Sequence, residues 1–153
     1  MTMIRISAVL IAVALLAGCS TNVSRFEMPG ADLAGIEALY LNELQEKRNA
    51  EEILSLVRSD LEARGYRVGE NSDAVQFGDQ DYVFDITADW HWDITWYLLE
   101  LRVAIYDPQD NTLIAQAQSQ QTSLARQSTD VVVERVMASL FNDEAVETEE
   151  APQ

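Results

Sequence analysis

The segment from Asp81 to Tyr106 reads DYVFDITADWHWDITWYLLELRVAIY. Apolar and polar side chains alternate from Tyr82 to Trp90, which is typical of a strand with one buried face. A second alternation runs from Tyr97 to Ile105, and Asp93 between the two is a common turn residue. The segment therefore predicts a hairpin, and the rest of the fold is predicted around it.

Strand parity predicts which side chains of the hairpin enter the core. Trp90 falls on the same side of the first strand as Phe84, so we expect its ring to be buried. Trp96 falls on the side of Glu100 in the second strand, so we expect it to be exposed. The opposite, apolar side of the second strand consists of Tyr97, Leu99, Leu101, Val103 and Ile105.

Two helices are predicted on either side of the hairpin. The first begins at Asn49, where Glu52 makes a capping-box-like start, and ends at Gly65, which suits a left-handed C-terminal position. Its apolar stripe comprises Ala50, Ile53, Leu54, Val57 and Leu61. The second helix, from about Ser128 to Asn142, carries the stripe Val132, Val133, Val136, Met137, Leu140 and Phe141. Each stripe needs a sheet to cover.

Two further segments complete the predicted sheet. The residues from Thr112 to Thr122 alternate after a turn at Asp107–Asn111, so they predict a third antiparallel strand. The segment Ile36–Leu41 suits a strand buried on both faces, although its composition is also compatible with a helix. We therefore predict an α+β domain over residues 36–142, a two-layer sandwich with a mostly antiparallel sheet of about four strands and two helices on one face.

A lipoprotein signal precedes this domain. Arg5 and an apolar run from Ile6 end in Leu16-Ala17-Gly18-Cys19, and the run is too short for a permanent membrane span. These features resemble the bacterial lipobox, which implies removal of residues 1–18, diacylglyceryl transfer to the Cys19 thiol and acylation of the new amine. Ser20 is not the aspartate of inner-membrane retention, so the resemblance implies an outer-membrane anchor that faces the periplasm.

Charge and cysteine content limit the classes of function. Cys19 is the only cysteine, so the domain relies on its core rather than on an internal disulfide. The formal net charge is −16, and loss of Arg5 with the signal leaves about −17. Such acidity argues against nucleic-acid partners and against membrane contact other than the lipid tether. Residues 19–35 are expected to form this tether, and Asp143–Gln153 a solvated, disordered acidic tail.

Several short motifs resemble one group of bacterial proteins. Beside the lipobox, these are Ala63-Arg64-Gly65-Tyr66 at the predicted helix end, Ala88-Asp89-Trp90-His91-Trp92-Asp93 with Tyr97, and Tyr106. Together they resemble small proteobacterial outer-membrane lipoproteins of an uncharacterised α/β family. The resemblance implies an envelope location and brings no established active site with it.

The tryptophan cluster is the chemically unusual part of the chain, because all three tryptophans lie between Trp90 and Trp96. Exposed aromatic rings stack on sugars or anchor protein partners, so Trp92, Trp96, His91 and Asp93 are candidate ligand or partner contacts. The same rings could instead pack across the hairpin as part of the core. A concave pocket around them would favour a ligand, and a flat exposed patch would favour a protein partner.

The sequence offers no catalytic or metal-binding motif. His91 is the only histidine and no free thiol accompanies it, so we expect no metal site. Asp85, Asp89 and Asp93 recur every four residues on the predicted solvent side, which is unsuited to a glycosidase pair. The chain has neither a phosphate-binding glycine loop nor a Ser/His/Asp arrangement, and we expect no cofactor.

Three kinds of function are compatible with these features. The first is a noncatalytic envelope lipoprotein that acts as an accessory or interaction component of a membrane or secretion complex, with an envelope protein as its partner. The second is a binding module for an envelope glycan or lipid that uses the Trp90–Trp96 hairpin. An enzyme is the third, and the missing motifs argue against it.

The lipobox makes a direct prediction about processing. Cys19→Ser should leave a full-length precursor without acyl chains, because a hydroxyl cannot replace the thiol in the thioether. Intact-mass spectrometry and N-terminal analysis of the envelope fraction check this. The same mature N-terminus in wild type and variant would contradict it.

Overall fold

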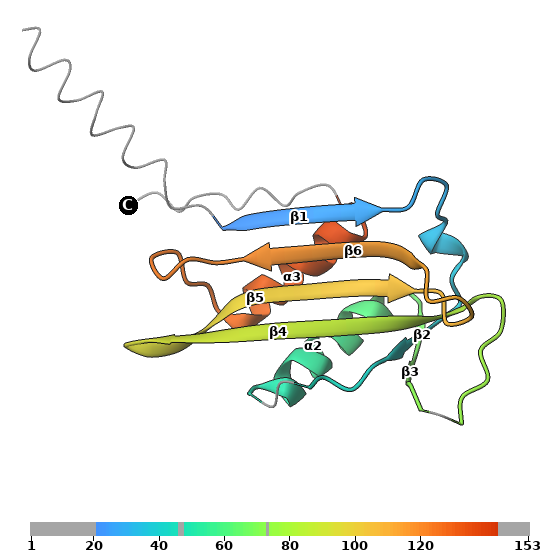
Figure 1. Cartoon of the computed structure of the whole chain (residues 1–153), viewed down its shortest axis with the longest axis horizontal. Coiled ribbons are helices and arrows are strands. Elements are labelled where there is room, and N and C mark those ends of the chain that lie inside the picture. The colour runs from blue at the N-terminus through green and yellow to red at the C-terminus, as the bar shows by residue number, and fades with distance from the viewer. Residues whose placement is uncertain (1–20, 46–47, 73, 144–153) are drawn as a thin grey trace, which may run out of the picture.

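The computed structural model describes residues 21–45, 48–72 and 74–143. It shows a six-stranded mixed sheet with two α-helices on one face (Figure 1). The predicted α+β class is therefore confirmed, with six strands where the sequence predicts about four. The predicted signal peptide (1–18), Cys19 and residues 144–153 of the acidic tail lie outside the described residues.

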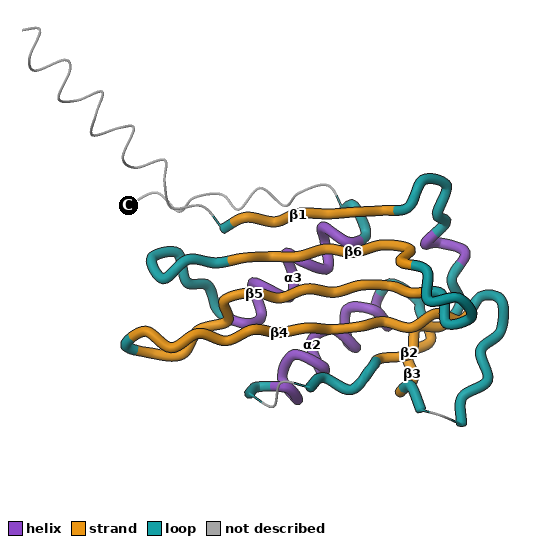
Figure 2. The backbone as a smooth tube through the Cα atoms, viewed as in Figure 1, coloured by secondary structure: helices purple, strands orange, loops and turns teal. Residues whose placement is uncertain are grey.

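The elements follow one another as two strands, a helix, four strands and a helix, as the backbone trace shows (Figure 2). Their bounds are β1 Asn22–Glu27, the short 3-10 helix η1 Leu33–Gly35, β2 Ala38–Leu41, α2 Ala50–Ala63, β3 Arg67–Glu70, β4 Asp81–Asp93, β5 Thr95–Tyr106, β6 Leu113–Gln120 and α3 Thr129–Leu140. Within the described ranges, neither helix has the length and apolar character that a membrane span requires.

The sheet has the order β1-β6-β5-β4-β2-β3. Strands β1, β6, β5 and β4 are antiparallel neighbours, which confirms the predicted hairpin and the strand that follows it. Strand β2 is parallel to both β4 and β3. A parallel pair of successive strands needs a crossover connection, and α2 supplies it between β2 and β3. Helices α2 and α3 cover one face of the sheet and leave the other face open (Figure 1).

Two strands are missing from the sequence-based prediction. Strand β1 lies within residues 19–35, so the prediction of a tether is wrong for Asn22–Glu27, which pairs with β6. Its sequence shows no clear alternation because β1 is an edge strand and most of its side chains are exposed. Strand β3 is a short edge strand whose Gly69 lies against Tyr40, where a Cβ would come within 2.8 Å of the ring.

The core lies between the sheet and the two helices, as predicted. Helix α2 buries Ile53, Val57 and Leu61, and α3 buries Val132, Val133, Val136, Met137 and Leu140. The sheet contributes Leu39, Leu41, Phe84, Ile86, Leu101, Val103 and Ile105. Each fully buried side chain of this kind stabilises the fold by about 1.5–3 kcal/mol, so this single layer is the main source of stability.

Helix α2 ends as its sequence predicts but begins differently. Gly65 has a φ of 97°, and the amide of Tyr66 bonds to the carbonyl of Leu61 at 3.1 Å, as in a Schellman motif. At the other end, Asn49 is itself left-handed, with a φ of 51°, and its side chain does not cap the helix amides. Its Nδ2 donates instead to Glu52 Oε2 at 2.8 Å. Of the predicted capping box, only this side-chain hydrogen bond between Asn49 and Glu52 is formed.

The end of α3 is held to the end of α2 by Arg64. Its guanidinium donates to both carboxylate oxygens of Asp143, at 3.1 and 2.6 Å, and to Asp60 Oδ1 at 2.5 Å. The same group lies over the ring of Phe141, 4.5 Å from its centroid. Asp143, the first residue of the predicted tail, is therefore exposed to solvent but bound to the domain. The hydrogen bonds from Arg64 lower the pKa of this carboxylate below its usual value.

Asp143→Asn should lower the free energy of unfolding at neutral pH by up to about 1 kcal/mol, because the ion pair is partly exposed and screened by solvent. The pKa of Asp143 is lower in the folded state, so the contribution is present above the unfolded pKa of about 3.9. It is lost as the pH falls through the folded-state value.

Denaturant unfolding of the wild type, Asp143→Asn, Arg64→Gln and the double variant, at neutral pH and at about pH 3, measures this contribution. We expect coupling between the two positions at neutral pH and less of it in acid. Purely additive effects at neutral pH would show that the pair contributes nothing.

Candidate functional site

Strands β4 and β5 form a hairpin that projects beyond the rest of the sheet. Strand β6 ends at Gln120, which pairs with Glu100, and Glu100 in turn pairs with Asp89. From Trp90 to the tip, β4 and β5 pair only with each other (Figure 2). The outer residues of the hairpin therefore have no other strand beside them.

A β-bulge changes the register at the base of this projection. Asp89 lies opposite Glu100, but the next residue, Trp90, lies opposite Leu98. Leu99 is therefore an extra residue in β5. Because side chains alternate between faces with a period of two, this one residue exchanges the faces of the β5 side chains between the bulge and the tip, and leaves those of β4 unchanged.

Gln121 holds the bulge from the end of β6. Its backbone amide donates to Leu99 O and its side-chain Nε2 donates to Leu98 O, both at 2.8 Å. Its Oε1 accepts a hydrogen bond of 2.6 Å from the amide of Gln127. Only 2% of Gln121 is exposed. A buried amide group with partners for both its oxygen and its nitrogen fixes the local backbone, so Gln121 specifies the bulge.

The bulge overturns the face predicted for Trp96. Trp96 lies directly opposite Trp92, and both lie on the same side of the hairpin as Trp90. The prediction that Trp96 shares the side of Glu100 is therefore wrong. Trp96 is nevertheless exposed, as predicted. The reason is that the hairpin extends past the end of the core.

The same register change exchanges other side chains of β5. Leu98 enters the core in place of Leu99. Tyr97 leaves the predicted apolar side and lies opposite His91 on the open side, where the two ring centroids are 5.7 Å apart. From Leu101 to Ile105 the alternation is as predicted, since these residues lie on the other side of the bulge.

One side of the hairpin is aromatic. Trp90 packs against the core, as predicted, while Trp92 and Trp96 are 58% and 49% exposed. The guanidinium of Arg48, just before α2, lies 3.9 Å from the ring centroid of Trp96 and stacks on it. The three tryptophans therefore do not share one role. Trp90 belongs to the core, and Trp92 and Trp96 form an exposed patch.

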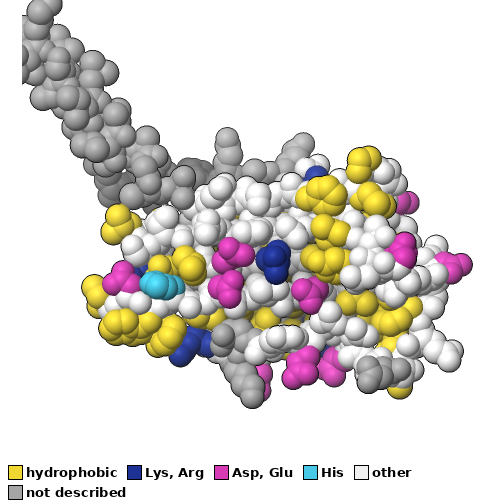
Figure 3. Space-filling model, viewed as in Figure 1, with side chains coloured by type: hydrophobic (Ala, Val, Ile, Leu, Met, Phe, Trp, Pro, Cys, Tyr) yellow, Lys and Arg dark blue, Asp and Glu magenta, His cyan; other side chains and the backbone are white. Residues whose placement is uncertain are grey.

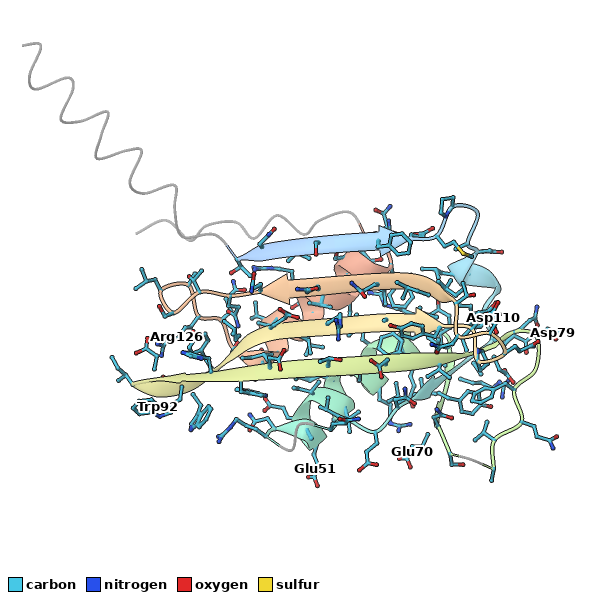
Figure 4. The ribbon with its side chains drawn as sticks, viewed as in Figure 1. Glu51, Glu70, Asp79, Trp92, Asp110 and Arg126 are labelled. Atoms are coloured by element: carbon cyan, nitrogen blue, oxygen red, sulfur yellow. The ribbon has the colours of Figure 1, made fainter. Side chains whose placement is uncertain are left out.

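The other side of the hairpin is polar and is held by Arg126, which lies at the same end as Trp92 (Figure 4). Arg126 donates to the carbonyl and the carboxylate of Asp93, at 2.9 and 3.1 Å, and to Thr95 Oγ1 at 2.7 Å. Its guanidinium also lies 4.5 Å from the ring centroid of Tyr97. The candidate contacts Asp93 and His91 therefore lie on the side away from the exposed tryptophans.

The hairpin reverses at Ile94, whose backbone is strained. Its φ is 64°, in the left-handed region, which costs a non-glycine residue about 1–2 kcal/mol. Its side chain is 84% exposed, so packing within the domain does little to offset this cost. The bonds of Arg126 to Asp93 and Thr95, on either side of Ile94, hold the turn in this conformation.

A hollow of about 420 Å³ lies at the other end of the sheet. Its lining residues are Asn42, Asn71, Phe77, Val83, Asp85, Tyr106, Pro108 and Asn111. Asn71 donates to Asn42, and Asn42 donates to Asp85, at 2.7 and 3.1 Å. Trp92 and Trp96 are not part of this lining. They form a patch on a projecting arm, which favours contact with a partner surface over capture of a small ligand.

Sequence patterns do not identify Gln121 or Arg126. Gln121 falls within the predicted strand Thr112–Thr122 but lies just after β6, and Arg126 lies in a loop without periodicity. Their partners Leu98 and Asp93 are 23 and 33 residues away in the sequence. The predicted lipidation site, Cys19, lies outside the described residues. In the part of the chain that the structure describes, no three His, Cys, Asp or Glu side chains are grouped so that they could hold a metal ion.

No protein-family model matches the sequence, and a search of curated proteins finds no relative. Among solved structures, the fold is similar to a PelC dodecamer from Paraburkholderia phytofirmans, with a TM-score of 0.58 and 14% identity over 80% of this chain and 96% of that chain. A point variant of this PelC dodecamer gives a TM-score of 0.55 and 12% identity over 80% and 95%. At such identity the likeness shows the fold alone.

Gln121→Leu should lower the free energy of unfolding by about 2 kcal/mol or more, because it leaves the carbonyl of Leu98 and the amide of Gln127 without their partner. Denaturant melts followed by tryptophan fluorescence measure the change. Gln120→Leu is the matched control, since Gln120, the preceding residue, is exposed at the end of β6 and its substitution should shift stability by no more than about 0.5 kcal/mol. Equal effects of the two substitutions would show that Gln121 does not hold the bulge.

Proposed function

We propose that this chain is a noncatalytic envelope lipoprotein that acts as an accessory or interaction component of a membrane or secretion complex. Acyl chains on Cys19 hold it at the outer membrane, facing the periplasm, and an envelope protein is its partner. The lipobox supports this localisation. The acidity of the chain argues against a nucleic-acid partner.

The observation that carries the proposal is the uncovered face of the sheet, which continues onto the polar side of the hairpin. Its polar side chains are Asp85, Thr87, Asp89 and His91 of β4, Glu100 and Arg102 of β5, and Gln116, Gln118 and Gln120 of β6. Figure 3 shows this face, with acidic groups around a basic group and the histidine near one end. Such a broad surface, with charges of both signs and many amide groups, is suited to hydrogen bonding with a protein partner.

The structural likeness supports protein contact as a use of this fold. The two PelC structures are of dodecamers, so copies of a chain with a similar fold assemble with one another there. This assembly is a reason to test whether the present chain also binds protein partners, including a second copy of itself.

A second candidate function is a binding module for an envelope glycan or lipid that uses the Trp90–Trp96 hairpin. The exposure of Trp92 and Trp96 on a projecting arm favours it, because indole rings there can stack on a sugar or lie on a lipid surface. The aromatic side and the open face point in opposite directions, so the two functions use different surfaces of one molecule.

Site-specific photo-crosslinking in intact envelopes tests the proposed function. A photoreactive amino acid replaces Thr87 or Gln118 on the open face of the full-length, lipidated chain, and Glu51 on α2 serves as the exposed control (Figure 4). We expect discrete protein adducts from Thr87 and Gln118 and few from Glu51, because only the first two lie on the proposed contact surface.

Adducts to a second copy of the chain would support an interaction role in which the protein is its own partner. Equal yields from all three positions, or no protein adducts from Thr87 and Gln118, would contradict a protein-binding open face.

A further inference from the structure

Four of the five large apolar side chains that remain exposed among the described residues lie at one end of the molecule. Among the described residues, the large ones are Phe26, Trp92, Ile94, Trp96 and Leu124, which are 46%, 58%, 84%, 49% and 82% exposed. Trp92, Ile94 and Trp96 belong to the hairpin, and Leu124 lies in the loop after β6 whose Arg126 is bonded to the hairpin (Figure 4). We call Trp92, Ile94, Trp96 and Leu124 the aromatic end.

The chain enters the domain at this same end (Figure 1). Strand β1 begins at Asn22, which pairs with Gln120, and Gln120 pairs with Glu100 at the base of the projecting hairpin. Cys19 precedes Asn22 by three residues, a distance of about 10 Å when extended. The tip of the hairpin lies five residues beyond Asp89, or about 16 Å along the strand. Asn22 and the aromatic end therefore lie at the same end of the molecule, and the chain length allows Cys19 to be no more than about 10 Å from Asn22.

We propose that the aromatic end contacts the surface of the phospholipid bilayer in which these acyl chains are inserted. This inference rests on the proposed lipidation of Cys19. The indole rings of Trp92 and Trp96 lie at the level of the lipid head groups, where amphipathic aromatic rings are favoured, and Ile94 and Leu124 enter the outer part of the acyl region. The strands then run roughly along the membrane normal, and the open face remains accessible to a protein partner.

This contact is apolar, which makes it compatible with the acidity of the chain. Arg48 stacks on Trp96, so one guanidinium group lies beside the exposed rings. On the other side of the hairpin, the carboxylate of Asp93 is paired with Arg126 at 3.1 Å. The acidity of the chain opposes binding to anionic lipid head groups, because like charges repel. An apolar contact can instead form with zwitterionic lipids, and its strength does not depend on the salt concentration.

The strained turn at Ile94 supports the same use. Glycine would adopt the observed φ of 64° without strain, yet this position carries a large apolar side chain that the described residues leave exposed. Strain that is kept at an exposed apolar tip is explained if the side chain is buried by something outside the domain. The bilayer surface provides such burial.

The tryptophans are natural probes of this contact, because all three lie in the hairpin. The lipidated full-length protein is reconstituted into phosphatidylcholine vesicles whose acyl chains carry bromine either near the head group or near the methyl end. We expect bromine near the head group to quench the tryptophan fluorescence several-fold more than bromine near the methyl end, at low and at high salt alike. Ile94→Gly should reduce this quenching without loss of thermal stability, since glycine relieves the turn.

A matched control places the indole at the other end of the sheet. In a variant that combines Phe77→Trp with Trp92→Phe and Trp96→Phe, the new ring lies beside the hollow, and Trp90, which packs against the core, is the one hairpin tryptophan that remains. Bromine should quench this variant far less than the wild type. Co-flotation of the wild type with vesicles, without quenching, would overturn the membrane contact and leave the lipid anchor intact. Blue-shifted but unquenched emission would overturn it in favour of a second copy packed on the rings. A protein that does not co-float would overturn the anchor, and this contact with it.

Discussion

The hydrogen bonds of Gln121 to the carbonyls of Leu98 and Leu99 determine what the hairpin presents to its surroundings. They stabilise one extra residue in β5, and that residue moves Trp96 to the side of Trp92. Without the bulge, the exposed indole rings would be divided between two faces of the sheet. With it, the three tryptophans lie on one side of the hairpin, and His91, Asp93 and Tyr97 lie on the other.

This separation gives the molecule two surfaces that can be used at the same time. The loop after β6 supports both, since Gln121 fixes the bulge and Arg126 fixes the tip. Strand β1 adds a second constraint, because its pairing with β6 leaves only two residues, Ser20 and Thr21, between Cys19 and the sheet. In the proposed lipoprotein, the domain therefore stands close to the membrane, and its orientation is set by the fold as well as by the lipid.

The sequence predicts the elements whose signals are local. The periodicity of α2 and α3 and the alternation of β4 are strong because each reports burial against one layer of core. Strand β1 gives no such signal, since it is a polar edge strand. The face of Trp96 could not be predicted either, because Gln121 lies 23 residues from Leu98 in the sequence and no local pattern shows that they meet.

The candidate site shows the same division between local and long-range information. The exposure of Trp96 is predicted from strand parity and is observed, but its cause is the extension of the hairpin past the core. The sequence leaves open whether Trp92 is exposed. The grouping of these two rings with His91 and Asp93 reflects only closeness in the sequence, because neighbours in a strand point to opposite faces. Arg126, which binds the polar side, comes from a loop 33 residues away and has no sequence signature.

The most direct test of this account is to measure which protons surround the indole ring of Trp96 in solution. Nuclear Overhauser spectra of the folded chain with labelled tryptophan and arginine give this information. We expect contacts from the Trp96 ring to Trp92 and to the side chain of Arg48. Contacts to Arg102 or Arg126 would place the ring on the open face and would contradict the bulge-directed separation of the two sides.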